Sequence, residues 1–149
     1  MGSEYLKTGN GQLAIDTFAA GLKIAPEDPA LRLNYGIALL NQKQYAAAET
    51  ELRLAIEKSK VYSVAAHYYL GVVLVSEHRT DEARAIFEEM LKNGGDKLPL
   101  VHRYLGGIYL QNKQYRQAAD ELDVYLKLDP KAADAEKIRE TIKDSRSKS

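Results

Sequence analysis

The chain has 149 residues, of which 45% are hydrophobic and 28% are charged, and this composition is typical of a folded soluble protein. Lysine plus arginine and aspartate plus glutamate both number 21, so no net charge draws nucleic acid or an anionic membrane over a distance. The absence of cysteine excludes a disulfide framework and a thiolate zinc site.

The beginning of the chain leaves the compartment open. Met1-Gly2-Ser3 has the composition of a cloning scar at 1–3, and neither a signal peptide nor a run of about 18–20 apolar residues is present. We expect a soluble protein without membrane insertion or a nucleic-acid partner, in the cytoplasm rather than in the periplasm or outside the cell.

In chain order, the sequence predicts hairpins of two apolar helices that recur about every 35 residues. The first unit, 4–27, is partial, because 4–7 is only the end of a helix and 12–24 is the helix after it. Three full units follow at 28–62, 63–97 and 98–130. A thinly apolar helix at 131–143 is predicted to cap the last hairpin, and 144–149 is predicted to be a flexible tail.

Two columns of small residues establish the period. The glycines are Gly36, Gly71 and Gly106, and the alanines are Ala14, Ala48, Ala83 and Ala118. A small residue at each crossing lets the two helices of a hairpin pack at close range. We therefore predict an all-α fold, a right-handed α-solenoid of helix-turn-helix hairpins with a C-terminal capping helix.

Together these columns resemble the tetratricopeptide repeat over residues 4–130, with a large apolar residue before each glycine and Pro26 and Pro130 closing two units. The resemblance implies a protein-binding scaffold that uses the inner face of the stack. Three departures are Arg32, His67 and His102, which stand where the family has an aromatic residue.

No catalytic arrangement is visible in the sequence. His67 and His102 share one column, so we expect them to fill the aromatic position, and His78 is expected to be solvated in a turn. No H-E-x-x-H, G-x-S-x-G or phosphate-binding loop is present. We predict a non-enzymatic protein with no catalytic residue, no metal site and no cofactor.

The candidate binding residues are those on the first helix of each hairpin that packing within the stack does not use. They are unusually apolar and aromatic for a solvent-facing surface. Two interpretations of the tyrosines stay open, a wedge between adjacent first helices or a ladder of Tyr69 and Tyr104 that grips a partner. The residues are Leu33, Asn34, Ile37, Asn41, Tyr68, Tyr69, Val72, Leu100, Arg103, Tyr104, Leu110 and Gln111.

The leading hypothesis is a scaffold that binds a peptide or helix of a partner protein in this concave groove. Of the binding residues of two known uses of the family, a clamp for a terminal carboxylate and an asparagine ladder, only Asn34 matches. One alternative is self-association through the truncated N-terminal end, where Leu13, Ile15, Phe18 and Leu22 would be partly uncovered. Another is the targeting arm of a larger multidomain protein.

Overall fold

The computed structural model of the protein describes residues 10–149, and these residues form eight α-helices and no strand. The prediction of an all-α fold is confirmed. The predicted cloning scar at 1–3 and the helix end at 4–7 lie outside the described residues.

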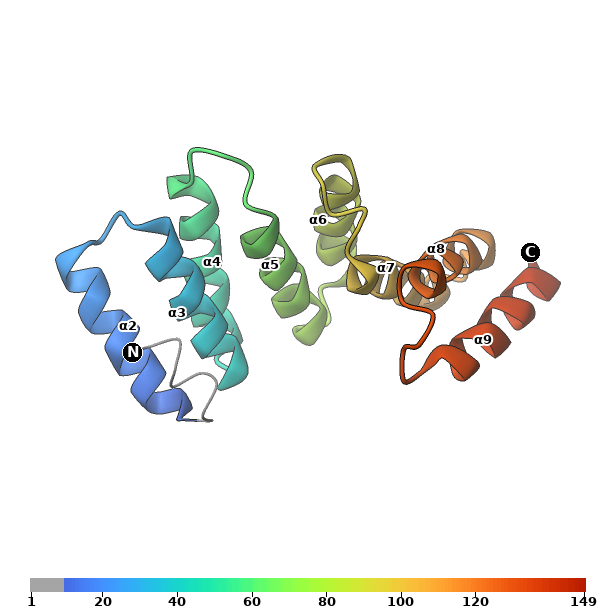
Figure 1. The fold of residues 1–149 in the computed structure, drawn as a ribbon, viewed down its shortest axis with the longest axis horizontal. Helices are drawn as coiled ribbons and strands as arrows, with labels where there is room; N and C mark the ends of the chain where they lie inside the picture. Colours follow the sequence, from blue (N-terminus) through green and yellow to red (C-terminus); the bar gives the residue numbers. More distant parts are fainter. Residues whose placement is uncertain (1–9) are drawn as a thin grey trace. The chain divides into compact units, whose positions relative to one another are not determined.

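The chain divides into two compact units, Met1–Ala83 and Arg84–Ser149, and the boundary falls within α6 (Thr80–Lys92). In the first unit α2 packs on α3, α3 on α4 and α4 on α5, and α5 also contacts α3 (Figure 1). This is the packing expected of successive hairpins. The other helices of this unit are α2 (Gly11–Ile24), α3 (Pro29–Asn41), α4 (Tyr45–Lys58) and α5 (Val64–Ser76).

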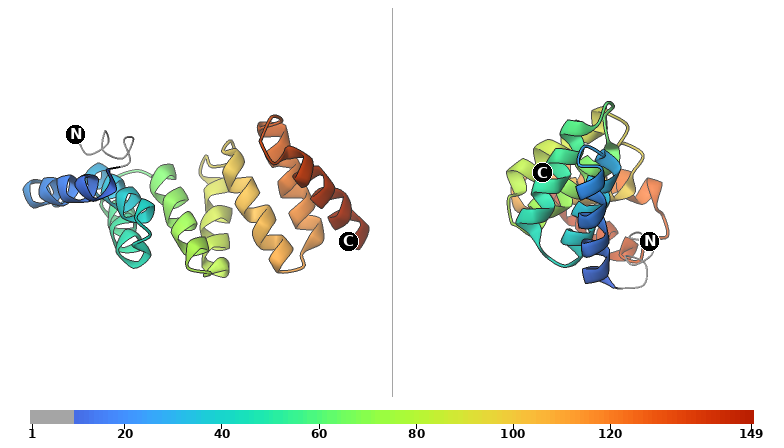
Figure 2. Two further views of the ribbon diagram at one scale, coloured as in Figure 1. Left: turned by 90° about the horizontal axis from the view of Figure 1, so that it is seen from below. Right: turned by 90° about the vertical axis from the view of Figure 1, so that its left-hand side faces the viewer.

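The second unit contains the hairpin of α7 (Pro99–Gln111) and α8 (Tyr115–Leu128), with α9 (Ala135–Lys148) packed on α8 (Figure 2). Leu110, Leu126 and Ala132 pack at the edge of the core between these helices. Helix α9 therefore covers an apolar face of the last hairpin. The buried members of this core are Ala119, Leu122, Tyr125, Ile138 and Ile142.

Helix α3 begins where its sequence predicts. The Asp28 carboxylate accepts hydrogen bonds from the backbone N–H groups of Ala30 at 2.8 Å and Leu31 at 3.1 Å. Pro29 is the first helical residue, where a missing N–H costs nothing. Asp28 thus satisfies two backbone N–H groups of the first turn that have no acceptor within the helix.

The glycine column marks helix crossings at the two positions where the contacts are resolved. A Cβ atom on Gly36 would lie 2.8 Å from Leu52 Cγ, and one on Gly106 would lie 2.6 Å from Leu122 Cγ. The prediction is confirmed for these two glycines. Gly71 is also buried, and its contact with the helix of Ala83 stays a prediction.

The turn within each of the three full hairpins contains one residue in the left-handed region, at φ 59° for Lys43, 61° for His78 and 56° for Lys113. The N–H of the next residue donates to a carbonyl five residues earlier, as in Arg79 to Leu74 at 2.9 Å. These turns are Schellman-type helix ends built without glycine. His78 is exposed there, as predicted.

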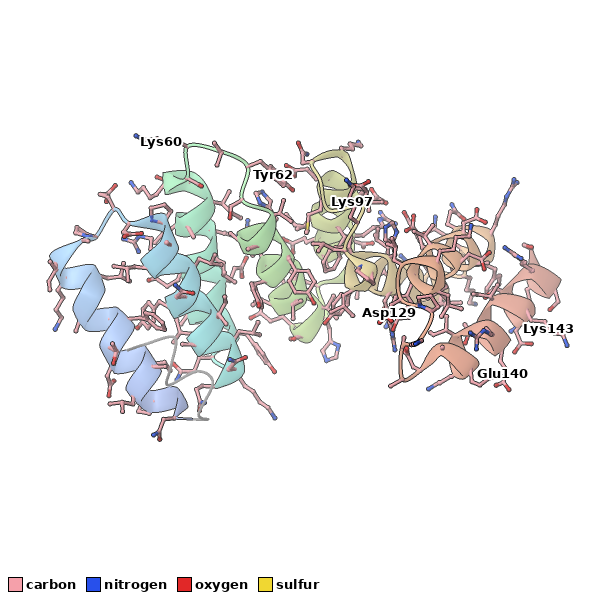
Figure 3. The ribbon with its side chains drawn as sticks, in the orientation of Figure 1. Lys60, Tyr62, Lys97, Asp129, Glu140 and Lys143 are labelled. Atoms are coloured by element: carbon pink, nitrogen blue, oxygen red, sulfur yellow. The ribbon has the colours of Figure 1, made fainter. Side chains whose placement is uncertain are left out.

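The structure corrects the C-terminal boundaries. The capping helix begins at Ala135 rather than at 131, and it continues to Lys148, through the segment 144–149 that was predicted to be a flexible tail. Long-range contacts explain the difference, because Ser145 is only 2% exposed and Arg146 pairs with Asp123 on α8. The polar side of α9, labelled at Glu140 and Lys143 in Figure 3, is exposed.

The apolar face of α2 is more covered than the sequence predicts. Ile15 and Phe18 are buried and Leu22 is half-buried, while Leu13 is 43% exposed. The expectation that all four side chains are partly uncovered is therefore wrong for Ile15 and Phe18. Both lie on the same face of α2 as buried Ala14, and α2 packs on α3.

Candidate functional site

In the first unit, the predicted binding residues lie on α3 and α5. Leu33, Asn34 and Ile37 of α3 are half-buried, and Asn41 at the end of that helix is exposed. Helix α5 is apolar on nearly every side, and its buried side carries Leu70, Gly71 and Leu74 among others. The remaining side of α5 is the one that the sequence assigns to binding.

The paired tyrosines of α5 lie against each other. Tyr68 and Tyr69 are half-buried, and their rings meet edge to face with centroids 5.3 Å apart and an interplanar angle of 74°. Such a contact orients both rings and reduces the rotamer freedom that binding would remove. Val72, one turn along, is also half-buried.

In the second unit, the predicted residues on α7 divide into two groups. Leu100, at 49% exposure, and Gln111 are exposed. Tyr104 stacks on Phe87 with centroids 5.2 Å apart and planes 7° apart, and Leu110 packs on the core between α8 and α9. Tyr104 and Leu110 therefore contribute to packing within the unit as well as to the face of α7.

Arg103 has a structural contact that the sequence did not suggest. Its Nε donates to Asp134 Oδ2 at 2.5 Å, and the Tyr125 hydroxyl donates to Asp134 Oδ1 at 2.7 Å. The Tyr125 hydrogen bond, followed by Arg103, holds the pKa of the Asp134 carboxyl below its usual range. Asp134, the residue before α9, is thus hydrogen-bonded to both α7 and α8.

Tyr69 belongs to the first unit and Tyr104 to the second. The predicted ladder of these two tyrosines therefore stays a prediction. What the structure brings together is, in each unit, a set of half-buried and exposed side chains on first helices, mixed apolar and polar.

The sequence also did not indicate the polar contacts of Arg32 and His102, two of the residues that stand where the family has an aromatic residue. Arg32 donates from Nε to the Pro26 carbonyl at 3.0 Å and from Nη1 to Glu51 Oε2 at 2.7 Å. His102 places Nε2 2.8 Å from the Asp96 carbonyl and Nδ1 2.6 Å from Glu121 Oε2. Both ring nitrogens of His102 thus have a polar partner within hydrogen-bond distance.

The two clamps share one geometry. In each, the side chain at the aromatic position lies within hydrogen-bond distance of a carbonyl six residues earlier and of a glutamate nineteen residues later, on the second helix of the same hairpin. Position 86, nineteen residues after His67, is an isoleucine. His67 instead stacks on Tyr62, in the loop before α5 (Figure 3), with centroids 4.0 Å apart. The sequence contained a signal for these contacts, because Glu51 and Glu121 each lie nineteen residues after Arg32 and His102.

A charged network joins the turn between α5 and α6 to α4. Arg79 donates from Nη1 to Glu49 Oε2 at 2.6 Å and from Nε to Glu82 Oε1 at 2.7 Å. The Arg79 hydrogen bond, with a smaller effect of Arg53, lowers the pKa of Glu49. These contacts hold adjacent hairpins of the first unit in register.

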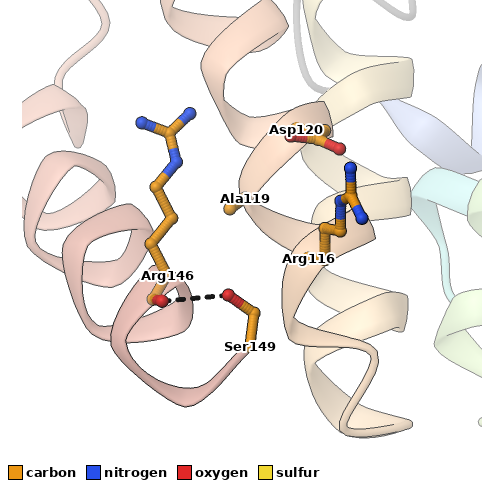
Figure 4. A pocket seen from close by; sticks show the side chains of 5 residues that line it. All are labelled: Arg116, Ala119, Asp120, Arg146 and Ser149. Atoms are coloured by element: carbon orange, nitrogen blue, oxygen red, sulfur yellow. Dashed lines mark hydrogen bonds between the residues drawn. The ribbon is translucent and has the colours of Figure 1, made fainter.

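A pocket of about 330 Å³ lies between α8 and α9 and is open to solvent. Arg116 and Arg146 border it, and the Ser149 hydroxyl donates to the Arg146 carbonyl at 2.9 Å (Figure 4). Its polar groups are these two guanidinium groups, the Asp120 carboxylate and the Ser149 hydroxyl. The other lining residues are Ala119 and Asp120.

Residues 10–149 contain neither a cluster of metal ligands nor a helix that could span a membrane. No group of three or more histidine, cysteine or acidic side chains is arranged to hold a metal ion. Over the same residues, no helix combines the length and apolar character that crossing a membrane requires.

The family profile described as Tetratricopeptide repeat matches residues 5–61 and 74–141. Mouse (Mus musculus) RNA polymerase II-associated protein 3 is 30% identical over 91 residues, which are 61% of this chain and 14% of that protein. Cell division cycle protein 27 homolog A of Arabidopsis thaliana is 32% identical over 117 residues, 78% of this chain and 16% of that protein. The chain thus spans 14–16% of the length of these curated relatives.

Solved structures show the same fold at low identity. MamA, residue 41 to the end, from Desulfovibrio magneticus RS-1 has a TM-score of 0.79 at 18% identity, covering 98% of this chain and 89% of that one. YrrB has a TM-score of 0.76 at 15% identity, covering 99% and 80%. These likenesses support a solenoid of tetratricopeptide-type hairpins.

Proposed function

Since this chain belongs to the tetratricopeptide repeat family, we propose that it is a non-catalytic scaffold that binds a segment of a partner protein on the faces of its first helices. The observation that carries the proposal is the mixed apolar and polar face that packing leaves unused on the first helices of each unit. In the first unit that face includes Asn34 and Asn41 on α3 and the Tyr68–Tyr69 pair on α5, and the corresponding face of the second unit includes exposed Leu100 on α7.

The tyrosine pair supports binding by apolar burial. Both rings are already oriented by their edge-to-face contact, so a partner would gain contact area at little cost in side-chain entropy. Each such contact contributes about 25 cal/mol per Å² of apolar surface, which ordering of a flexible peptide partly offsets. Affinity in the micromolar range is therefore expected for a short segment.

The relatives add a parallel from their descriptions. YrrB is described as a TPR protein with an unusual peptide-binding site, and the name of RNA polymerase II-associated protein 3 places it with another protein. We carry over only the general role of binding protein segments, because the identities are low and the covered share of the curated relatives is small.

The test uses peptides selected on the wild-type protein from a random display library of twelve-residue peptides. The double variant Tyr69→Ala with Leu100→Ala removes half-buried Tyr69 from the first unit and exposed Leu100 from the second, without opening the Tyr104–Phe87 stack. We expect the dissociation constants of the selected peptides, measured by fluorescence anisotropy, to rise about tenfold or more.

Tyr45→Ala is the matched control, since Tyr45 is a half-buried tyrosine at the start of α4, a second helix. It should leave peptide affinity within about twofold of wild type. Circular dichroism confirms that each variant is folded. Unchanged affinity in the double variant would remove the first-helix faces from consideration.

Self-association is a second candidate, supported by exposed Leu13 on α2. The support is narrower than the sequence indicates, because Ile15 and Phe18 are buried within the chain. Light scattering over a concentration series, with Leu13→Asp as the variant, decides it. A mass that stays monomeric at high concentration eliminates this candidate.

A role as the targeting arm of a larger protein accords with the small part of the curated relatives, 14–16% of their length, that this chain matches.

A further inference from the structure

We infer, on the basis of the function proposed above, that one surface of the second unit binds an acidic partner segment. This surface, the α7 face, consists of Leu100, Arg103, Gly107 and Gln111, which share one side of the helix. The main chain of the segment lies over Gly107, and an aspartate or glutamate of the segment meets Arg103.

Arg103 presents unused donors in a fixed position. Its Nε bonds Asp134, whose other oxygen is occupied by Tyr125, so the guanidinium is held at one edge. Its side chain is 42% exposed, and within residues 10–149 neither terminal nitrogen has a hydrogen-bond acceptor. A partner that supplies an acceptor meets a guanidinium whose orientation is already fixed.

The chemistry of these donors favours a carboxylate over a neutral acceptor. The terminal nitrogens of a guanidinium are spaced to match the two oxygens of a carboxylate, and such charge-assisted pairs are stronger than neutral hydrogen bonds. The chain has no net charge to steer an acidic partner from a distance. The preference should therefore depend on direct contact with Arg103.

Gly107 leaves room for the partner's backbone. No heavy atom lies within 4 Å of the position that its Cβ would take, whereas neighbouring Gly106 is required by the close approach of Leu122. A glycine inside a helix costs about 1 kcal/mol relative to alanine, and no contact within residues 10–149 requires this one. The bare backbone allows a second main chain to approach closely.

The spacing on the helix sets the pattern of the partner segment. Arg103 and Gly107 are four residues apart, about 6 Å along the helix axis, which is close to two residues of extended chain. The acidic residue is thus expected about two positions from the residue over Gly107. Leu100 beyond Arg103 offers 49% of its surface to an apolar side chain on the other side.

The test uses a positional-scanning array of ten-residue peptides in which one position is fixed as Glu, Gln or Lys. Wild-type protein should bind the best Glu-fixed pools about tenfold more tightly than the matched Gln-fixed pools. Arg103→Gln should lower this ratio of affinities to about one, and Arg103→Lys should lower it to an intermediate value. Arg116→Gln, which removes an exposed arginine on α8, is the matched control and should leave the ratio unchanged.

Gly107→Ala tests the second half of the inference with a readout that packing alone would not produce. A methyl group there meets nothing within the unit, so the variant should be more stable than wild type. It should also bind all pools more weakly, by about tenfold, whichever residue is fixed. Unchanged binding would overturn the placement of the partner backbone over Gly107.

The wild-type protein supplies a measurement that needs no variant. The ratio of Glu-fixed to Gln-fixed binding should shrink between 50 mM and 500 mM salt, because exposed charge pairs are screened. Peptide binding without a Glu preference, or a preference that survives Arg103→Gln, would overturn the acidic assignment and leave the scaffold function standing. Binding of no pool at all would remove the scaffold function itself.

Discussion

Two adjacent glycines of α7 have opposite surroundings. The position of a Cβ on Gly106 lies 2.6 Å from Leu122, while the corresponding position on Gly107 has no neighbour within 4 Å. Both residues lose the same backbone entropy on folding. The difference between them therefore isolates the effect of helix crossing on stability.

We expect Gly106→Ala to lower the free energy of unfolding by about 1–2 kcal/mol, since overpacking exceeds the gain in helix propensity. Gly107→Ala should raise the free energy of unfolding by about 0.5–1 kcal/mol. Urea denaturation followed by circular dichroism measures both. Equal effects of the two substitutions would contradict the crossing at Gly106.

At the aromatic column, the sequence predicted burial but not the polar partners. The period placed Arg32, His67 and His102 in one column, and the two histidines are buried as expected. The bonds of Arg32 and His102 to Glu51 and Glu121 depend on side-chain geometry between helices, which periodicity alone does not specify. A search for charged residues at matched spacing would have predicted them.

At the scale of single elements, the turns within hairpins carry strain that glycine would relieve. Lys113 adopts φ 56° at the end of α7, a region that costs a residue with a side chain about 1–2 kcal/mol. Its neighbour Asn112 has φ −85°, in a region open to all residues. The left-handed residue recurs at Lys43 and His78.

Lys113→Gly is expected to stabilise the second unit by about 0.5–1 kcal/mol, because glycine adopts the left-handed conformation without a steric penalty. Asn112→Gly, the control one residue earlier, should instead destabilise it by a similar amount through the entropy of the unfolded chain. Thermal unfolding followed by circular dichroism compares the two. Lower stability of Lys113→Gly would show that the lysine side chain stabilises the turn.

Helix α9 shows where local sequence signals are insufficient. The apolar residues Ile138 and Ile142 predicted a capping helix, and both are buried against α8. The predicted start at 131 is wrong because a turn around Ala132 precedes the helix and Asp134 is held by Arg103 and Tyr125. These are tertiary contacts, and the polar composition of the segment gave no sign of them.

Across the whole molecule, acidic side chains with lowered pKa values link stability to pH. Hydrogen bonds from Arg79 and Tyr125 lower the pKa of Glu49 in the first unit and of Asp134 in the second. A carboxyl whose pKa is lower in the folded state stabilises the fold above its unfolded pKa. That contribution is lost as the pH falls through the folded pKa.

We therefore expect the free energy of unfolding to decrease as the pH is lowered from about 5 to 3, starting near the ordinary pKa values of 4.5 for Glu and 3.8 for Asp. Urea denaturation at each pH measures this. Glu49→Gln and Asp134→Asn should each be less stable at pH 7 and show a shallower acid dependence.

Glu140→Gln, which changes an exposed carboxylate of α9, is the control and should follow the wild-type curve. Stability that stays constant or rises between pH 5 and 3 would contradict the assigned ion pairs. Because Glu49 and Asp134 belong to different units, their effects should add in the double variant.

The fold was more predictable than the candidate site for a physical reason. Packing repeats along the chain, so columns such as Gly36 and Gly106 disclose it in one sequence. A binding face is defined by what packing leaves unused, and that depends on side-chain contacts. Tyr104 against Phe87 and Arg103 against Asp134 are two such contacts that the sequence did not indicate.

The Arg32–Glu51 and His102–Glu121 clamps limit how the hairpins of this chain can be recombined. If the first helix at Pro99–Gln111 were grafted onto the second helix at Thr80–Lys92, His102 would face Ile86 instead of Glu121. Nδ1 of the histidine would then be buried without its polar partner, a defect that typically costs about 1–3 kcal/mol. Designed shufflings of these repeats should therefore exchange whole hairpins, or transfer the glutamate along with the arginine or histidine that it contacts.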